Sequence, residues 1–265
     1  MPETVDLKSR SVKRYGWVPD LPDARDFMFA APEAVLGNLP AQVDLRPHCP
    51  PVYDQGQLGS CTANAIGAAF EFAQMKEELS AFTPSRLFIY YNERTIEGTV
   101  DQDSGAMIRD GIKSVNKVGV CTEESWAYDI ARFTEKPPQR AYTEARHHQA
   151  TVYRRVQPTL RQMQSALATG IPFVLGFSVY ESFESSEVAR TGIVPIPQSK
   201  ERLLGGHAVM AVGYDDATKR FLIRNSWGTG WGMDGYCTMP YDYLTDGSLA
   251  RDFWAIYAVE KPTKS

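Results

Sequence analysis

The sequence predicts an α+β protein of two lobes, with helices in the first half of the chain and antiparallel strands in the second. Apolar residues recur at helical spacing before about residue 150, whereas short apolar segments separated by turn residues follow it. Helices first and strands later is the order expected of an α+β fold. With 265 residues, 43% of them hydrophobic, the chain can form one large domain or two small ones.

Composition and charge argue against several classes of partner. A net charge of −4 and an isoelectric point near 5.7 disfavour nucleic acid and anionic membranes as partners. No apolar run approaches the length of a membrane span, and the charged stretch from Met1 to Trp17 lacks the apolar core of a signal peptide. We therefore expect a soluble protein, cytoplasmic or secreted by another route, whose compartment the sequence leaves open.

The cysteines indicate neither a disulfide framework nor a metal site. There are four in the chain, Cys49, Cys61, Cys121 and Cys237, which is too sparse a set for a disulfide scaffold. No two of them have the spacing of zinc ligands, so we expect no metal and no cofactor. All four are predicted to be reduced thiols.

Residues 1–38 have the pattern of an N-terminal extension. Three prolines, at positions 19, 22 and 32, discourage a long helix. Trp17 and the apolar run Phe27-Met28-Phe29 should be buried somewhere, so we expect the extension to lie on the main domain. The alternative is a loose tail.

Four helices are predicted, over residues 61–76, 83–91, 106–118 and 159–169. Ser60 is the expected N-cap of the first helix, and Thr83 caps the second with Pro84 at its first position. Gly119 ends the third helix in the left-handed conformation that such helix ends prefer.

Six strands are predicted in the second half, over residues 171–179, 192–197, 207–214, 220–225, 235–239 and 253–259. A polar turn at residues 215–219 should join the third and fourth of them into an antiparallel hairpin. The tail from Lys261 to Ser265 is expected to be frayed.

Cys61 stands where a glycine-punctuated loop becomes a helix of small residues. In the first helical turn the dipole and the unpaired N–H groups favour a negative charge, and the thiolate is the nucleophilic form of cysteine. A buried, inert thiol at a helix start is the ordinary alternative. The rest of the chain has to decide between the two.

His207 and Asn225 lie on the two strands of the predicted hairpin. We pair Tyr214 with Arg220 across the turn. His207 then lies opposite Trp227 and diagonal to Asn225, so these three side chains project from one face of the sheet. The Asn225 oxygen can accept the imidazole N–H and fix its tautomer, while the indole covers that bond. A register slip of one residue would break this arrangement.

Cys61, His207 and Asn225 together supply the residue types of a cysteine nucleophile. Such a nucleophile needs a base to take its proton, and the base needs a group that orients it. Among the four histidines, His207 alone follows glycines and opens a buried strand. The combination favours nucleophilic chemistry at Cys61 over an inert thiol.

Three segments carry a resemblance to a known family: Gln55-Gly56 with Gly59-Ser60-Cys61, Gly206 to Tyr214, and Asn225-Ser226-Trp227-Gly228-Thr229-Gly230-Trp231-Gly232 continuing to Tyr236. With Ala41 to Arg46, which resembles a mature N-terminus, they are similar to the papain family of cysteine peptidases. The resemblance runs from Leu39 to about Val259. His207 and Asn225 follow Cys61 by 146 and 164 residues, near the roughly 130–150 typical of that family.

The chain departs from the family pattern at three positions. Leu58 replaces a cysteine that usually forms a disulfide, so that bridge is absent. Thr62 replaces an aromatic residue that packs behind the nucleophile, and Gly206 stands where papain itself has aspartate. The extension is also shorter than the family's plant and animal pro-segments. These departures indicate a bacterial branch of the family.

The resemblance implies a papain-like two-lobed fold with the active-site cleft between the lobes. Residues 1–38 would be a pro-segment-like extension and residues 39–265 the catalytic domain. Within that domain, the helical lobe would cover about 45–150 and an antiparallel, β-barrel-like lobe about 151–250.

The resemblance also implies the chemistry. Cys61 would be the nucleophile, His207 the general base and later acid, and Asn225 the residue that orients His207. Gln55 would form the oxyanion hole with the Cys61 N–H, and hydrolysis would pass through a thioester. A thiolate–imidazolium pair is the expected resting state.

A peptide or protein substrate is expected in the cleft, cleaved as by an endopeptidase. It would lie as an added strand on Ser104-Gly105-Ala106-Met107, with Gly206 and Trp227 as further contacts. Ala106, Met107 and Gly176 would line the S2 pocket, which then suits a medium apolar side chain. The chain's own extension is the expected intramolecular inhibitor, as in a zymogen. A papain-fold acyl transferase or deubiquitinating-type hydrolase, and an inactive peptide-binding relative, are the alternatives.

Overall fold

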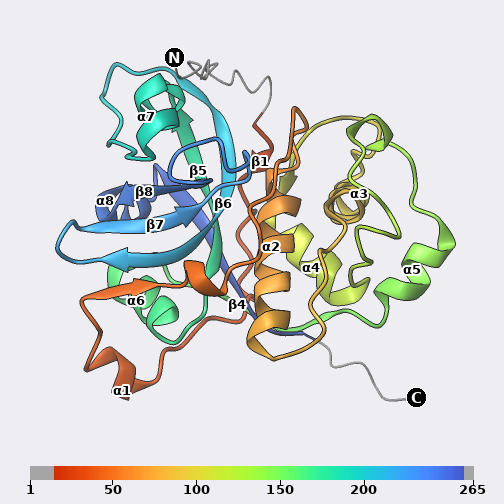
Figure 1. Ribbon diagram of the computed structural model, residues 1–265, viewed down its shortest axis with the longest axis horizontal. Helices are drawn as coiled ribbons and strands as arrows, with labels where there is room; N and C mark the ends of the chain where they lie inside the picture. Colours follow the sequence, from red (N-terminus) through yellow and green to blue (C-terminus); the bar gives the residue numbers. More distant parts are fainter. Residues whose placement is uncertain (1–14, 260–265) are drawn as a thin grey trace, which may run out of the picture.

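A computed structural model describes residues 15–259, and its elements form two lobes on either side of one central helix (Figure 1). Helix α2 (Cys61–Lys76) contacts helices α3 (Arg86–Glu97) and α4 (Ile108–Lys117) on one side and the strands of a sheet on the other. The first 14 residues of the extension and the tail expected to be frayed, residues 261–265, lie outside the described residues.

The helices agree with the predicted ones in place but not at every end. Helix α2 has the predicted bounds, whereas α3 begins later because Ser85, not Thr83, is its cap: the Ser85 hydroxyl accepts from the Phe88 N–H at 3.1 Å. Gly119 has the expected positive φ of 87°. The remaining helices are α1 (Glu33–Leu36), α5 (Gln139–Ala145), α6 (Leu160–Ala168), α7 (Ser186–Thr191) and α8 (Tyr241–Thr245).

Within residues 15–259, seven strands form one antiparallel sheet in the order β4-β9-β5-β6-β7-β8, with β2 paired to β6. This ladder ends at β4 and β8, so the barrel-like lobe is an open sheet. The predicted strand at 192–197 is wrong: only Ile193 forms a bridge, to Thr238. The strands are β2 (Gln42–Asp44), β4 (Ala150–Arg155), β5 (Phe173–Tyr180), β6 (Leu203–Asp215), β7 (Arg220–Arg224), β8 (Tyr236–Pro240) and β9 (Ala250–Val259).

The β6–β7 hairpin keeps the predicted register only at the end that faces the site. Tyr214 pairs with Phe221, not Arg220, but Met210 pairs with Arg224, as the predicted register requires. The register shifts between Ala211 and Gly213. One extra residue on β6 forms this bulge and restores the predicted alignment further along the strand.

The N-terminal segment crosses between the two lobes. Its strand β1 (Trp17–Val18) pairs in parallel with β3 (Ala106–Met107), which precedes α4 (Figure 1). Trp17 and Phe29 are buried as expected. Phe27 and Met28 are 69% and 44% exposed, so the expectation that the whole apolar run is buried was wrong.

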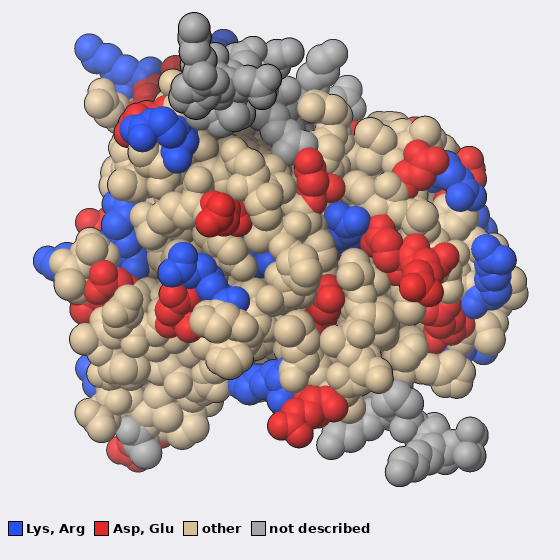
Figure 2. Space-filling view, viewed as in Figure 1, with Lys and Arg blue, Asp and Glu red and all other residues tan. Residues whose placement is uncertain are grey.

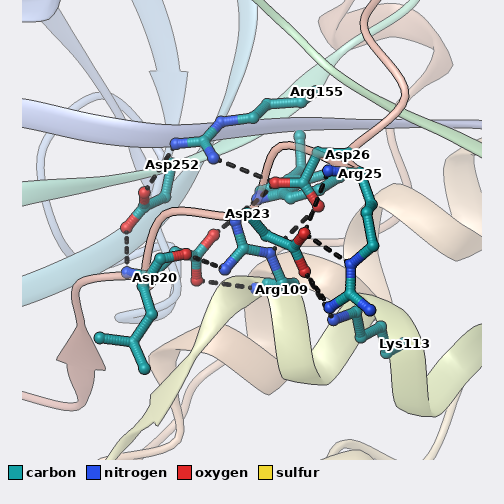
Figure 3. Close-up of polar contacts among 10 residues, drawn as sticks. Asp20, Asp23, Arg25, Asp26, Arg109, Lys113, Arg155 and Asp252 are labelled. Carbon is teal, nitrogen blue, oxygen red and sulfur yellow. Dashed lines mark hydrogen bonds and ion pairs between the residues drawn. The ribbon is translucent and has the colours of Figure 1, made fainter.

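A cluster of ion pairs fastens this segment to both lobes (Figure 3). Asp26 lies between Arg109 of α4, at 2.5 Å, and Arg155 of β4, at 3.1 Å. Asp20 accepts from the Arg109 backbone N–H at 3.0 Å and from the indole of Trp254 on β9 at 2.8 Å. Because these partners belong to different lobes, the segment is held over the boundary between them.

Charged side chains of both signs lie on the face of the molecule in view in Figure 2. Figure 2 shows Lys and Arg interspersed with Asp and Glu there. Among the helices of residues 15–259, none combines the length and the apolar character that crossing a bilayer needs.

Candidate active site

Cys61 opens α2 and is completely buried. Ser60 occupies the N-cap position as predicted, but its side chain makes no capping hydrogen bond. Instead its hydroxyl pairs with the Tyr128 hydroxyl at 2.5 Å, and Asn64 donates to its carbonyl at 2.9 Å. The loop ahead of the cysteine is therefore fixed by neighbours outside the usual cap.

Two opposing influences act on the Cys61 sulfur. The backbone N–H groups of Ala208, Gly16 and Thr62 bond to it and favour the thiolate. Burial outweighs them and raises the pKa of the Cys61 thiol to about 12. In this state the sulfur is a neutral thiol, unlike the thiolate expected from the helix start.

His207 and Asn225 meet as the hairpin predicts. The His207 Nε2 lies 2.8 Å from the Asn225 Oδ1, and the imidazole and Trp227 rings are 5.0 Å apart. All three side chains are buried on one face. Ala208 follows His207 directly, and its N–H reaches the Cys61 sulfur. The part of β6 that contains His207 and Ala208 therefore lies against the first turn of α2.

Gln55 joins the loop before Cys61 to the segment directly after β7, in which Asn225 lies. Its Nε2 donates to the Leu58 carbonyl at 3.0 Å, and its Oε1 accepts from the Ser226 hydroxyl at 2.6 Å. Its backbone N–H donates to the Ser226 carbonyl at 2.9 Å. A primary amide carries two N–H donors, and the Leu58 contact uses one of them.

The predicted substrate-binding strand already holds an extended backbone, that of the N-terminal segment. The Ala106 N–H donates to the Gly16 carbonyl at 2.7 Å. Gly105 has a positive φ of 71°, and a Cβ there would lie 2.2 Å from the Gly16 oxygen. The Met107 N–H and the Ser104 hydroxyl are engaged within the helical lobe, by Glu97 and Thr99.

Trp17, the residue after Gly16, fills a slot between Gly176 and Gly206. A Cβ on Gly176 would lie 2.0 Å from its ring, and one on Gly206 would lie 2.6 Å from it, so only glycines leave room for the indole. At the far end the Trp17 Nε1 donates to Asp252 at 3.2 Å. Gly206, predicted as a substrate contact, therefore lines this slot.

Tyr15 covers the other side of the site. Its ring packs edge-on against His207 at 6.0 Å and lies 6.4 Å from Trp227. Its hydroxyl donates to Glu184. Three consecutive residues, from Tyr15 to Trp17, therefore cover the nucleophile, the histidine and the slot.

Several polar residues near the site were not identified from the sequence. Glu93 of α3 is completely buried and accepts from the Thr62 hydroxyl at 2.6 Å, and burial raises its pKa. Asp103 accepts from the Gly59 N–H. Asp103 begins the segment that resembles the family's substrate-binding strand, but no role was predicted for it, whereas Asp252 belongs to no motif and only the fold brings it to the site.

All four cysteines are free thiols. In the described part of the chain, no group of three or more His, Cys, Asp or Glu side chains is placed to hold a metal ion.

Comparisons with known proteins agree with this geometry. The family model described as papain family cysteine protease matches residues 39–252. The crystal structure of xylellain, a cysteine protease from Xylella fastidiosa, is 46% identical with a TM-score of 0.88, covering 93% of this chain and 96% of that one. An uncharacterized peptidase C1-like protein of Acanthamoeba polyphaga mimivirus is 44% identical over 94% of this chain and 88% of its own length. A cathepsin B-like protein of Giardia intestinalis is 31% identical over 76% and 69%.

Proposed function

The chain belongs to the papain family of cysteine proteases, and we propose that Cys61, His207, Asn225 and Gln55 carry its peptidase chemistry. His207 takes the thiol proton while the sulfur attacks the peptide carbonyl, and it returns the proton to the leaving amine as the C–N bond breaks. Water then hydrolyses the thioester with His207 again as base. Gln55 and the Cys61 N–H hold the oxyanion, and one such donor is worth about 3–4 kcal/mol.

One observation carries this assignment. His207, which bonds to Asn225, is followed directly by Ala208, and the Ala208 N–H bonds to the Cys61 sulfur. The 2.8 Å contact between His207 Nε2 and Asn225 Oδ1 orients the ring, and we assign the proton transfer to the other ring nitrogen, Nδ1. Since the Ala208 N–H bonds to the Cys61 sulfur, the imidazole and the thiol are neighbours across the two lobes.

Residues 1–38 act as an intramolecular inhibitor of the catalytic domain, residues 39–265. Gly16 supports this, because it presents its N–H to the Cys61 sulfur and its carbonyl to Ala106. A sulfur that faces an amide hydrogen has no carbonyl carbon to attack. The segment thus fills the cleft as a strand without offering a scissile bond.

The substrate is an extended peptide that passes through the cleft, which suits an endopeptidase. The segment itself supports this, because it occupies the cleft on both sides of Gly16, with Tyr15 against His207 and Val18 paired to Met107. The slot that Trp17 fills becomes available to the substrate on release. Its shape, with Asp252 at the end, favours a long or flat side chain with a donor at its tip over the medium apolar one.

Alkylation by an epoxide that labels papain-type cysteines tests the assignment of the nucleophile. In a Gly16→Ala background, the chain and its Cys121→Ala variant should be labelled once per chain, and its Cys61→Ala variant should not be labelled. Cys121 is the matched control because it is also a fully buried free thiol. This background is used because the segment covers Cys61 in the parent chain, which should be labelled more slowly. Equal labelling of Cys61→Ala would contradict the assignment.

A further inference from the structure

A polar chain joins the loop before the nucleophile to the strand that holds the bound backbone. The Gly59 N–H donates to both carboxylate oxygens of Asp103, at 3.0 and 3.2 Å. The Tyr90 hydroxyl donates to the same carboxylate at 2.5 Å. The Gly105 N–H in turn donates to the Tyr90 hydroxyl at 3.2 Å. Four residues from three segments therefore form one connected set.

The two ends of this chain are both at the site. Gly59 lies two residues before Cys61, in the loop that Gln55 also binds through the Leu58 carbonyl. Gly105 lies next to Ala106, whose N–H holds the Gly16 carbonyl. The spacing between the sulfur and the strand that receives an extended peptide therefore depends on Asp103 and Tyr90.

No disulfide fixes the spacing between the loop before Cys61 and this strand. All four cysteines are free thiols, and Leu58 occupies the loop position at which the family usually has a disulfide-forming cysteine. A carboxylate that accepts two N–H or O–H bonds is a strong restraint, because hydrogen bonds to a charged group are worth about 1.5–3 kcal/mol. The loop is built for this contact: a Cβ on Gly59 would lie 2.9 Å from the Asp103 Oδ1.

Tyr90 is itself held rigidly. It is completely buried on α3, and Arg94, one turn on, lies over its ring with the guanidinium carbon 4.0 Å from the ring centroid. Arg94 also donates to the Gln102 carbonyl at 2.9 Å, directly before Asp103. Burial and the neighbouring Asp103 charge raise the pKa of Tyr90, so its hydroxyl keeps the proton that it donates.

We propose that Asp103 and Tyr90 are positioning residues for peptide hydrolysis, which set the nucleophile loop at a fixed distance from the substrate-binding strand. Neither residue touches the reacting atoms. Asp103 acts on the loop through Gly59, and Tyr90 acts on the strand through Gly105. The proposal rests on the function proposed above for Cys61 and for residues 104–107.

The two residues should have different kinetic effects. Asp103→Ala frees the Gly59 N–H and misplaces the loop that carries the nucleophile, so kcat for a peptide substrate should fall by about 10- to 100-fold, as loss of a hydrogen bond to a charged group implies. Asp103→Asn keeps a carbonyl oxygen for Gly59 and should recover most of that loss. Tyr90→Phe leaves Asp103 on Gly59 but releases Gly105, so it should raise KM by about 3- to 10-fold with little change in kcat.

A small thiol reagent separates positioning from folding. Iodoacetamide reaches a thiol without occupying the strand, so its rate at Cys61 should change less than threefold in all these variants. Each is measured in the full chain and in a Trp17→Ala background, which empties the slot without depending on the Asp103 contact to Gly59, together with its unfolding temperature. Asp101→Ala is the matched control, because Asp101 is an exposed acid two residues away on the same segment.

The outcomes distinguish this proposal from the one on which it rests. Loss of peptide hydrolysis with retained alkylation and retained folding supports the positioning role. Asp103→Ala and Tyr90→Phe with the kinetics of Asp101→Ala, or with hydrolysis and alkylation falling in the same proportion, would overturn it. If the parent chain is not alkylated at Cys61 and cleaves no peptide in either background, the proposed function itself fails, whatever the variants do.

Discussion

Replacing Gly16 by alanine is expected to release the N-terminal segment and raise peptidase activity. A Cβ on Gly16 would lie 1.7 Å from the backbone oxygen of Gly59 and 2.4 Å from its carbonyl carbon. Even close C–H···O contacts keep carbon and oxygen about 3.3 Å apart. Gly59 cannot retreat freely, because Asp103 holds its N–H. The segment must therefore move instead.

The size of the effect follows from what that movement breaks. A displacement of more than an ångström removes the 2.7 Å bond from the Ala106 N–H to the Gly16 carbonyl, which is worth about 1 kcal/mol. Overpacking against a fixed backbone adds about 1–3 kcal/mol. Since each 1.4 kcal/mol is tenfold, a total of about 2–4 kcal/mol makes the open state about 30- to 700-fold more populated. Activity should rise by that factor until the open state dominates.

The assay is hydrolysis of a fluorogenic peptide by the full chain, with the unfolding temperature measured alongside. Gly230→Ala is the matched control, because a Cβ there meets no atom within 4 Å. Trp17→Ala provides a second route to the same state by emptying the slot between Gly176 and Gly206. If Gly16→Ala and Trp17→Ala are folded and cleave the peptide no faster than the parent and Gly230→Ala, the segment does not control access to Cys61.

Two further predictions concern the pH dependence of release and the side chain that the slot prefers. Burial and the Asp252 charge raise the pKa of Asp20 to about 6 in the docked segment, so docking retains a proton that release loses, and docking weakens as pH rises from about 4 to 7. The activity of the parent relative to Gly16→Ala should therefore rise from pH 5 to 7.5, and a flat ratio, or the same rise in Asp20→Asn, would contradict this origin. In the Gly16→Ala background, peptides that place Trp or Arg in the slot should be cleaved faster than peptides that place Val there. Asp252→Ala should lower the cleavage rate of the Arg peptide most, and an unchanged ranking of the three rates would show that Asp252 does not select the side chain.

The sequence was sufficient where local patterns specify the structure. Helix α2 was predicted with its observed bounds, because a glycine-rich loop and a run of small residues mark its start at Cys61. The His207–Asn225 contact was predicted from hairpin geometry, since side chains two residues apart share a face. The predicted pairing at the turn was wrong by one residue. The bulge between Ala211 and Gly213, which compensates for this error in register, has no local signature in the sequence.

Contacts between distant parts of the chain could not be predicted in this way. Asp252 receives the backbone N–H of Asp20, 232 residues earlier, at 2.8 Å, and both are ordinary surface residue types. Burial of Trp17 was expected, but its place between Gly176 and Gly206 depends on the parallel pairing of β1 with β3. Strand β4 was missed because its charged residues obscure the alternation of apolar and polar residues by which a strand is recognised.

Release of the segment changes the chemistry of Cys61 as well as its exposure. The docked Gly16 supplies an N–H that favours the thiolate, yet it also completes the burial that raises the pKa of the thiol to about 12. Burial is the larger of the two influences on the sulfur, so we expect the exposure to solvent that follows release to lower the pKa of the thiol. The N–H groups of Ala208 and Thr62 belong to the catalytic domain and stay with the sulfur. If the segment inhibits as proposed, the displacement that admits a substrate should therefore also favour the thiolate at Cys61, and the docked chain would be held inactive both by the covered cleft and by a protonated thiol.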